Sequence, residues 1–173
     1  MRTQLILSDI EEYLGKDPAV LLGSCCAHDQ LHHICVEPVI DRAEAIVSAS
    51  ETCRSLYEEI LPVLALRINQ ELSIDISILG YRLILGNWLR NFIETVHERH
   101  VNLLQAFKLF PESYIANTCP PAGILVNDYP EFQKHLQTTS YNRLLFLQII
   151  KEIAPERFEG TFPPLPEDVH ILK

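Results

Sequence analysis

The sequence predicts a helix-rich α/β domain with a small parallel sheet. Short apolar runs typical of buried strands come early in the chain, at residues 3–7, 19–23 and 34–39. Two long amphipathic segments, separated by only a few residues, follow them. The chain has 173 residues, of which 47% are hydrophobic and 21% charged. A chain of this length can bury roughly 70% of its unfolded surface in one compact domain.

The first strand is predicted at residues 3–7 (TQLIL). After it, Ser8 and Glu11 have the spacing of a capping box for a brief helix that Gly15 can end. The second strand is predicted at 19–23 (AVLLG). The third is predicted at 34–39 (ICVEPV), where Pro38 favours an edge strand or a strand end.

Ser48 and Glu51 form a second capping box, which predicts a helix running to about Leu72 and kinked at Pro62. Its predicted buried face contains apolar residues at helical spacing: Cys53, Tyr57, Ile60, Leu64 and Ile68. The next helix is predicted to begin at Asp75 or Ser77 and to end near Lys108, before Pro111. Because the connection is so short, the two helices are expected to pack antiparallel.

The last third of the chain predicts one more strand and two helices. Residues 123–126 (GILV) read as a fourth strand, and Asp128 followed by Pro130 begins a short helix. Pro155 ends the final helix. Its buried face is marked by apolar residues at helical spacing: Tyr141, Leu145, Ile149 and Ile153. We therefore expect one domain over residues 1–160 and a proline-rich tail or linker over 161–173.

Composition argues against several classes of function. Fourteen Lys and Arg against 23 Asp and Glu give a net charge of -9, which opposes binding to nucleic acid or to an anionic membrane. No apolar run approaches the roughly 18 residues that a transmembrane helix needs. Five cysteines are an odd set for paired disulfides, so free thiols and a cytoplasmic location are expected.

Self-sufficient catalytic motifs are missing from the sequence. It contains no Walker loop, no G-x-G-x-x-G after a strand, no G-x-S-x-G and no H-E-x-x-H, and no cofactor is expected. The segment CCAHDQLHHIC offers zinc-type ligands at Cys25, Cys26, His28, His32 and Cys35. They all lie in one predicted loop, whereas structural zinc sites usually combine two separated pairs. Buried thiols with exposed histidines are the plainer interpretation, and a zinc site is the alternative.

The second long helix carries polar groups within its densest apolar run. Its predicted core stripe consists of large apolar side chains: Ile78, Tyr81, Leu85, Trp88, Phe92, Val96, Leu103 and Phe107. Arg82, Gly86 and Asn87 lie among them. A guanidinium or an amide that loses water there needs either a partner inside the protein or a ligand. Arg82 and Asn87 are therefore candidate substrate-binding residues.

Four further residues are candidates for binding substrate. Glu11 or Glu12 can contact a sugar hydroxyl or act as a general base, although Glu11 also serves as a capping residue. Gly23 follows a predicted strand, where it either permits close approach of a ligand or simply forms a turn. Arg42, next to Asp41, can grip a phosphate or carboxylate, or form a surface ion pair.

The order of several segments resembles a known family. These are LSDIEEYL, AVLLGSCC, the pair Asp41 and Arg42, YEEILPVLALRIN, YRLILGNWLRNF, NDYPEF and YNRLLFLQII. Together they are similar to the amino-terminal region of a transferase family found in bacterial O-antigen and surface-polysaccharide regions. The resemblance covers nearly the whole chain, although no single motif in it is specific.

The resemblance implies the amino-terminal half of a glycosyltransferase-like protein with two Rossmann-like lobes. The other lobe, or a partner chain, would hold the activated sugar donor. This chain would then be the acceptor-side domain, with a sugar or nucleotide sugar as its possible ligand and no catalytic activity alone. Arg82 and Arg42 would bind anionic groups, and Glu11 or Glu12 would contact hydroxyls.

The competing hypothesis is a noncatalytic binding or partner protein, a degenerate relative of that family. Two observations favour it: the missing catalytic motifs, and departures from the family pattern at Ser24, Cys25, Gly80 and residues 38–40. An exposed apolar patch would also favour it.

Overall fold

The computed structural model describes residues 3–7, 19–22, 34–116, 126 and 128–159. The predicted brief helix after Ser8, most of the predicted strand at 123–126 and the tail at 161–173 lie outside these residues. The described chain is a mostly helical α/β fold with a small parallel sheet, as the sequence predicts. It divides into two compact units, residues 1–38 with 102–173 and residues 39–101. Helix α2 contributes residues to both.

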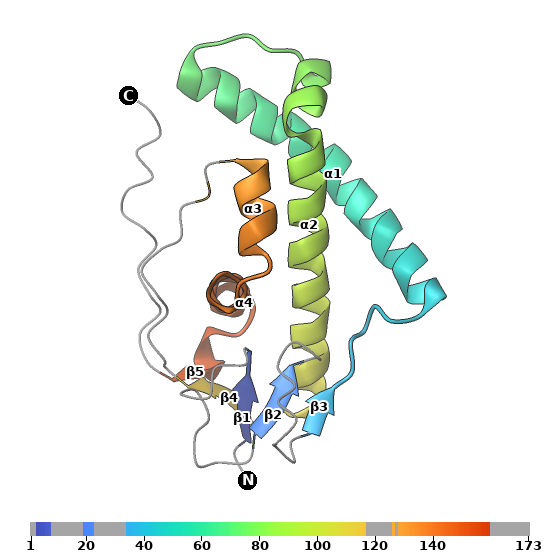
Figure 1. Cartoon of the computed structure of the whole chain (residues 1–173), viewed down its shortest axis with the longest axis vertical. Helices are drawn as coiled ribbons and strands as arrows, with labels where there is room; N and C mark the ends of the chain where they lie inside the picture. Colours follow the sequence, from blue (N-terminus) through green and yellow to red (C-terminus); the bar gives the residue numbers. More distant parts are fainter. Residues whose placement is uncertain (1–2, 8–18, 23–33, 117–125, 127, 160–173) are drawn as a thin grey trace. The chain divides into compact units, whose positions relative to one another are not determined.

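The first unit contains the sheet, whose strand order is β3-β2-β1-β4-β5 (Figure 1). The strands are short: β1 Thr3–Ile6, β2 Ala19–Leu22, β3 Ile34–Val36, β4 Ser113–Ala116 and β5 Phe158–Glu159. All four pairings are parallel, and Leu5 of β1 lies beside Val20 of β2. Residues 4–7 are all buried, because β1 is the central strand and both of its faces are covered.

The predicted strands at 3–7, 19–23 and 34–39 correspond to β1, β2 and β3, each ending one to three residues earlier than expected. The sequence reading missed β4 and β5. β5 has only two residues, too few to show a period of two, and β4 (SYIA) shows neither strict alternation nor an unbroken apolar run. Pairing with a neighbouring strand, rather than local pattern, makes these segments strands.

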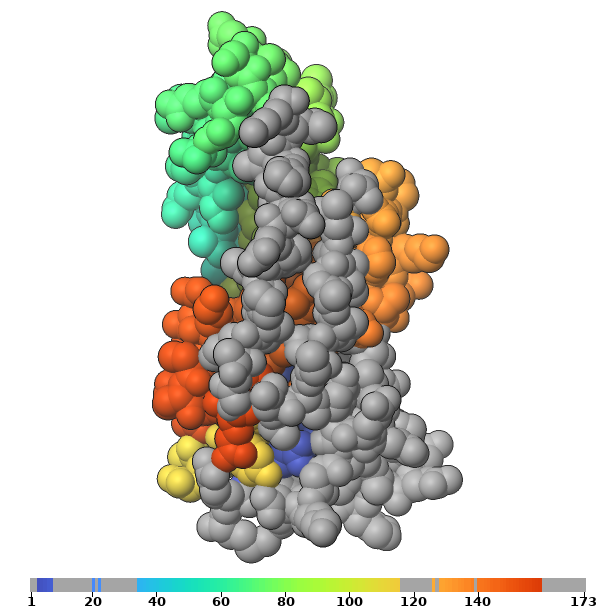
Figure 2. Space-filling view, turned by 90° about the vertical axis from the view of Figure 1, so that its left-hand side faces the viewer, coloured from blue at the N-terminus to red at the C-terminus, as the bar shows by residue number. Residues whose placement is uncertain are grey.

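Helices α2 (Ile78–Leu109) and α4 (Thr139–Ile153) supply the rest of the core of the first unit. Leu103, Ala106 and Phe107 of α2 join strand residues and α4 residues in one buried cluster. The α4 members are Phe146, Leu147 and Ile150. After α4 the chain forms a single 3-10 turn, η3 (Pro155–Arg157), and then β5, and Figure 2 shows these red residues beside β4 in yellow.

Arg157 fixes the start of β4. Its guanidinium donates hydrogen bonds to the carbonyls of Phe110 and Ser113, at 3.4 and 3.2 Å, and lies 4.6 Å from the ring centroid of Phe107. One arginine thereby satisfies carbonyls that follow the end of α2.

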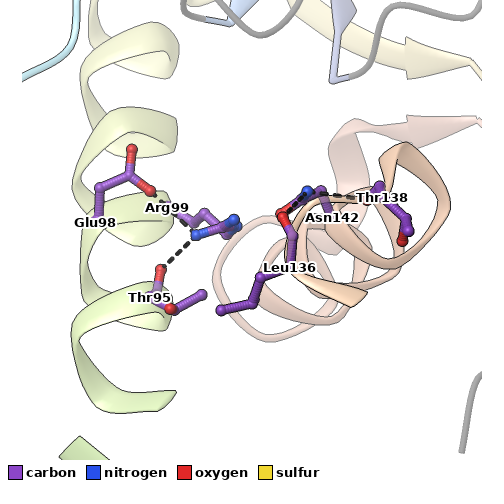
Figure 3. Close-up of polar contacts among 6 residues, drawn as sticks. All are labelled: Thr95, Glu98, Arg99, Leu136, Thr138 and Asn142. Atoms are coloured by element: carbon purple, nitrogen blue, oxygen red, sulfur yellow. Dashed lines mark hydrogen bonds and ion pairs between the residues drawn. The ribbon is translucent and has the colours of Figure 1, made fainter. Parts of the chain in front are cut away.

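Side-chain caps set the boundaries of the last two helices. Asp128 accepts a hydrogen bond from the Glu131 amide at 2.8 Å and begins α3 (Tyr129–His135), as predicted. Thr138 caps α4 in the same way. Asn142 donates to the carbonyls of Leu136 and Thr138, which closes the connection between the two helices (Figure 3).

The second unit consists of α1 (Ala43–Leu72), the connection at 73–77 and the first part of α2 (Figure 1). Its core is a separate cluster of buried side chains from both helices: Cys53, Leu61, Ala65, Tyr81, Leu89 and Ile93. The predicted capping box at Ser48 and Glu51 is wrong, because α1 begins at Ala43 and both residues lie inside the helix. The segment AEAIV has adequate helix propensity, and the negative charge of Glu44 in the first turn stabilises the helix by interacting with its dipole.

The buried stripe of α2 differs from the predicted one. Ile78 is 47% exposed and Leu85, Trp88, Phe92 and Val96 are half-buried. Leu89, Ile93 and Ala106 are buried instead. A single helix that serves two different cores need not keep one continuous stripe. None of the helices in the described part of the chain combines the length and apolar character needed to cross a membrane.

Candidate functional site

Asn69 organises the connection between α1 and α2. Its side-chain amide donates to the carbonyl of Ile76 at 3.0 Å and accepts from the Ile76 amide at 3.1 Å. The Tyr81 hydroxyl donates to the same Asn69 oxygen at 2.7 Å. Ser73, in a left-handed conformation at φ 52°, ends α1. These contacts fix where α2 begins relative to α1, and therefore which residues of the two helices meet.

Gly86 permits close contact between the helices farther along. A Cβ atom at this position would lie 2.8 Å from the hydroxyl of Tyr57. Tyr57 can therefore lie against the backbone of α2 only because residue 86 has no side chain. The same tyrosine ring is 5.6 Å from the guanidinium carbon of Arg82, within the range of a cation–π contact.

A cleft of about 380 Å³ lies between α1 and α2 within this unit. Five of its lining residues are charged: Arg54, Glu58, Arg82, Arg90 and Glu94. Its neutral lining residues are Ser50, Cys53, Tyr57, Gly86 and Asn87. We call this the α1–α2 cleft. Its volume falls within the range of small-molecule sites.

Arg82 and Glu58 form a two-pronged ion pair in the cleft. The Nη1 atom of Arg82 donates to Oε1 of Glu58 at 2.8 Å, and Nη2 donates to Oε2. The Arg82 side chain is 40% exposed and that of Glu58 is 50% exposed. The hydrogen bonds from Arg82 lower the pKa of Glu58, and those to Glu58 raise the pKa of Arg82. Both groups are therefore charged at neutral pH.

The remaining charges leave the cleft with one more positive than negative group, in a chain whose net charge is -9. Arg90 pairs with Glu94 at 3.6 Å, one helical turn away. Within the described part of the chain, Arg54 makes no hydrogen bond or ion pair, although its charge contributes to lowering the pKa of Glu58. The Cys53 thiol is buried, and burial and the nearby Glu94 raise its pKa, so it is a poor nucleophile.

Two of the six predicted substrate-binding residues, Arg82 and Asn87, line this cleft. The expectation that they lose water among apolar neighbours is wrong, because both are exposed. Asn87 lies on the side of α2 away from Leu89 and Ile93. Arg82 is in line with those residues along the helix, but its guanidinium pairs with Glu58 at the surface instead of entering the core. Among the described residues, Arg143 of α4 is the buried arginine, and Arg99 is largely buried, donating to the Thr95 carbonyl and to Glu98 (Figure 3).

The other predicted site residues do not line the cleft. Arg42 is 84% exposed just before α1 and lies 3.8 Å from Asp41, as an exposed ion pair. Glu11, Glu12 and Gly23 lie outside the described residues. So do the possible zinc ligands Cys25, Cys26, His28 and His32, while Cys35 is an exposed free thiol in β3. Among the residues that the structure describes, no cluster of His, Cys, Asp or Glu could hold a metal ion.

Sequence reasoning missed most of the charged lining, although a signal was present. Residues 82, 86, 90 and 94 recur every fourth position, and so do residues 50, 54 and 58. That spacing places each set along one face of its helix. Only the packing of α1 on α2 shows that the two faces border the same cleft.

A family model described as LIC12162 family transferase matches residues 3–165. Neither a curated protein nor a solved structure matches the chain.

Proposed function

Because this chain belongs to the LIC12162 transferase family, we propose that it is the acceptor-side, amino-terminal domain of a bacterial surface-polysaccharide glycosyltransferase-like protein. The O-antigen type of polysaccharide is the proposed context. The observation that carries the proposal beyond the family is the α1–α2 cleft, where three arginines border a cavity large enough for a sugar phosphate.

The proposed fold is a Rossmann-like lobe. The strand order β3-β2-β1-β4-β5 supports it, because doubly wound sheets have this order. In such sheets ligands bind beyond the carboxyl ends of the strands. Glu11 and Glu12 follow β1 in the sequence and Gly23 follows β2, which supports their proposed contacts with substrate. An antiparallel helical pair is supported by contacts that join position 69 to 81 and position 57 to 86.

In the α1–α2 cleft, we assign Arg82 to an anionic group of the substrate and Asn87 to a neighbouring hydroxyl or carbonyl. Arg42, which does not line the cleft, is a second proposed anion contact outside it. Glu58 does not fit a general base, because its lowered pKa leaves it a weak proton acceptor at neutral pH. This favours binding over acid–base catalysis in the cleft. A second lobe or partner chain would supply the donor nucleotide sugar, in the cytoplasm, and this chain would not transfer sugar alone.

Thermal unfolding of the chain with a ligand panel tests the proposal. The panel contains glucose 1-phosphate, UDP-glucose and the uncharged disaccharide maltose. We expect glucose 1-phosphate to raise the melting temperature and maltose to leave it unchanged, because the arginines require an anion. Arg82→Gln should abolish the shift, while Arg67→Gln, on α1 but not lining the cleft, should retain it. No shift with either anionic ligand would contradict the proposal.

One observation favours the second candidate, a noncatalytic binding or partner protein. Most of the large apolar side chains exposed among the described residues belong to α1, α2 and their connection, including Val63, Leu79 and Leu83. A gene for a Rossmann-like lobe next to this one, among polysaccharide genes, supports the transferase, and isolation from such genes supports the partner protein.

A further inference from the structure

Glu58 already binds the guanidinium of Arg82, which is the group that an anionic ligand in the cleft would need. Its two carboxylate oxygens accept both terminal nitrogens of Arg82, which is the geometry in which arginine also binds a phosphate. The pair is not buried, since the two side chains are 40% and 50% exposed. Water solvates both partners, so exchange of the carboxylate for another anion does not leave a charge stranded in the core.

The surroundings of the pair favour an anion with more charge than a carboxylate. Arg54 and Arg90 line the same cleft, and Arg54 lies one helical turn before Glu58 on α1. A phosphoryl group carries close to two negative charges at neutral pH and has three acceptor oxygens. It can therefore contact Arg82 and a second arginine together, whereas Glu58 is already satisfied by Arg82 alone.

A displaced Glu58 would keep a partner. Arg54 already acts on the Glu58 charge through space, and the two residues have the i, i+4 spacing at which side chains on a helix meet. Rotation of Glu58 toward Arg54 would open the Arg82 guanidinium to the cleft. The exchange needs only side-chain movement, because both partners are on the helix surface.

Building on the proposed function, we propose that the α1–α2 cleft binds the phosphoryl group of a sugar phosphate, or of a diphosphate, in competition with Glu58. Glu58 sets the selectivity of the site: it excludes singly charged carboxylates and yields to dianions. The cleft then recognises the phosphoryl end of the substrate rather than its sugar.

Titration calorimetry on the whole chain at pH 7 and low salt, with inorganic pyrophosphate as the probe, tests this competition. Glu58→Gln removes the competing charge and should tighten pyrophosphate binding by roughly two- to ten-fold. Acetate, which wild type should not bind measurably, should gain weak binding in the same variant. Arg82→Lys keeps the charge but loses the planar fork, and should weaken pyrophosphate binding by about ten-fold.

Glu71→Gln is the matched control. It changes the net charge equally and breaks an Arg67–Glu71 pair on the same helix, but neither residue lines the cleft. Its affinity for pyrophosphate should stay within about two-fold of wild type. If Glu71→Gln and Glu58→Gln gain the same affinity for pyrophosphate, the gain comes from net charge alone and the proposal is overturned.

Two further outcomes decide between this inference and the proposed function. If glucose 1-phosphate stabilises wild type but Glu58→Gln gains no affinity for pyrophosphate, competition is wrong and the proposed function stands. If pyrophosphate binds neither wild type nor Glu58→Gln, the phosphoryl site itself is rejected. If Glu58→Gln binds pyrophosphate more tightly than wild type but sugar phosphates do not raise the melting temperature, the anion site is supported and the transferase role is not.

Discussion

The charge of the α1–α2 cleft depends on a few side chains that are exposed although their neighbours in sequence are apolar. Arg82 is flanked by Tyr81 and Leu83, yet its guanidinium is at the surface and engages Glu58, 24 positions away in the sequence. An exposed, doubly bonded pair is weakly stabilising but well oriented. Such a pair contributes more to recognition than to the free energy of unfolding.

The Glu58–Arg82 pair should make a small, pH-dependent contribution to stability. The folded-state pKa of Glu58 is lowered from 4.5, so the contribution is present above that value and is lost as the pH falls through the folded-state pKa. The melting temperature of wild type should exceed that of Glu58→Gln at pH 7, and the difference should shrink toward pH 3. Arg82→Gln should remove the same pH dependence. A difference that persists undiminished at pH 3 would contradict this assignment.

Gly86→Ala should separate binding from stability. Alanine in a helix interior is favoured over glycine by about 1 kcal/mol, but the new methyl would meet the Tyr57 hydroxyl at 2.8 Å and displace it. We expect the melting temperature to be retained or raised, with pyrophosphate affinity reduced several-fold.

Gly80→Ala is the matched control, because its methyl would meet Ile76 at 2.7 Å, outside the cleft. Calorimetry gives the pyrophosphate affinity of both variants, and thermal unfolding gives their melting temperatures. Equal loss of pyrophosphate affinity in the two variants would remove Gly86 from the site.

At the scale of elements, one amide anchors α1 to α2 at the end where the two helices are connected. Asn69 bonds to both backbone groups of Ile76 and to the Tyr81 hydroxyl, which joins the end of α1, the connection and the start of α2. Because Ser77 also accepts a hydrogen bond from the Gly80 amide, the start of α2 is fixed from two sides. Movement of this start would carry Arg82 away from Glu58.

Asn69→Ala should therefore lower the free energy of unfolding by about 1–3 kcal/mol, since it leaves the Ile76 groups and the Tyr81 hydroxyl without their partner. Tyr81→Phe removes one of the three bonds and should cost about 0.5–1.5 kcal/mol. Urea unfolding followed by circular dichroism measures both. If Asn69→Ala costs no more than Tyr81→Phe, the backbone bonds to Ile76 contribute nothing.

At the scale of the whole molecule, the residues that the structure describes form two cores, and their exposed apolar side chains are distributed unevenly. Strands, the end of α2 and α4 surround one core, and the other lies between α1 and α2. The surface of the second unit presents Leu79 at 68% and Leu83 at 82% exposure, one helical turn apart. Large exposed apolar groups at helical spacing are common where a partner surface or a second lobe packs.

A double variant, Leu79→Gln with Leu83→Gln, should keep the wild-type melting temperature within about 2 °C, because surface substitutions rarely change stability by more than about 0.5 kcal/mol. It should also bind less of a hydrophobic dye and self-associate less, as measured by fluorescence and light scattering. A marked loss of stability would mean that these leucines pack inside the folded chain.

Local patterns determined the fold class and most of the elements. Apolar runs indicated β1 to β3, and the Asp128 cap and Pro155 bounded the last helices. Asp75 or Ser77 and Pro111 bounded α2, because these signals act within a few residues. The sequence also singled out Arg82 and Asn87.

The sequence could not identify β4 and β5, which are strands only through their neighbours. Nor could it show that Arg82 meets Glu58 and Tyr57, since that contact depends on how the whole of α1 packs on α2. Short-range signals gave most helix ends but not the start of α1 or the buried face of α2, because tertiary packing decides which face of a helix is covered and what it contacts.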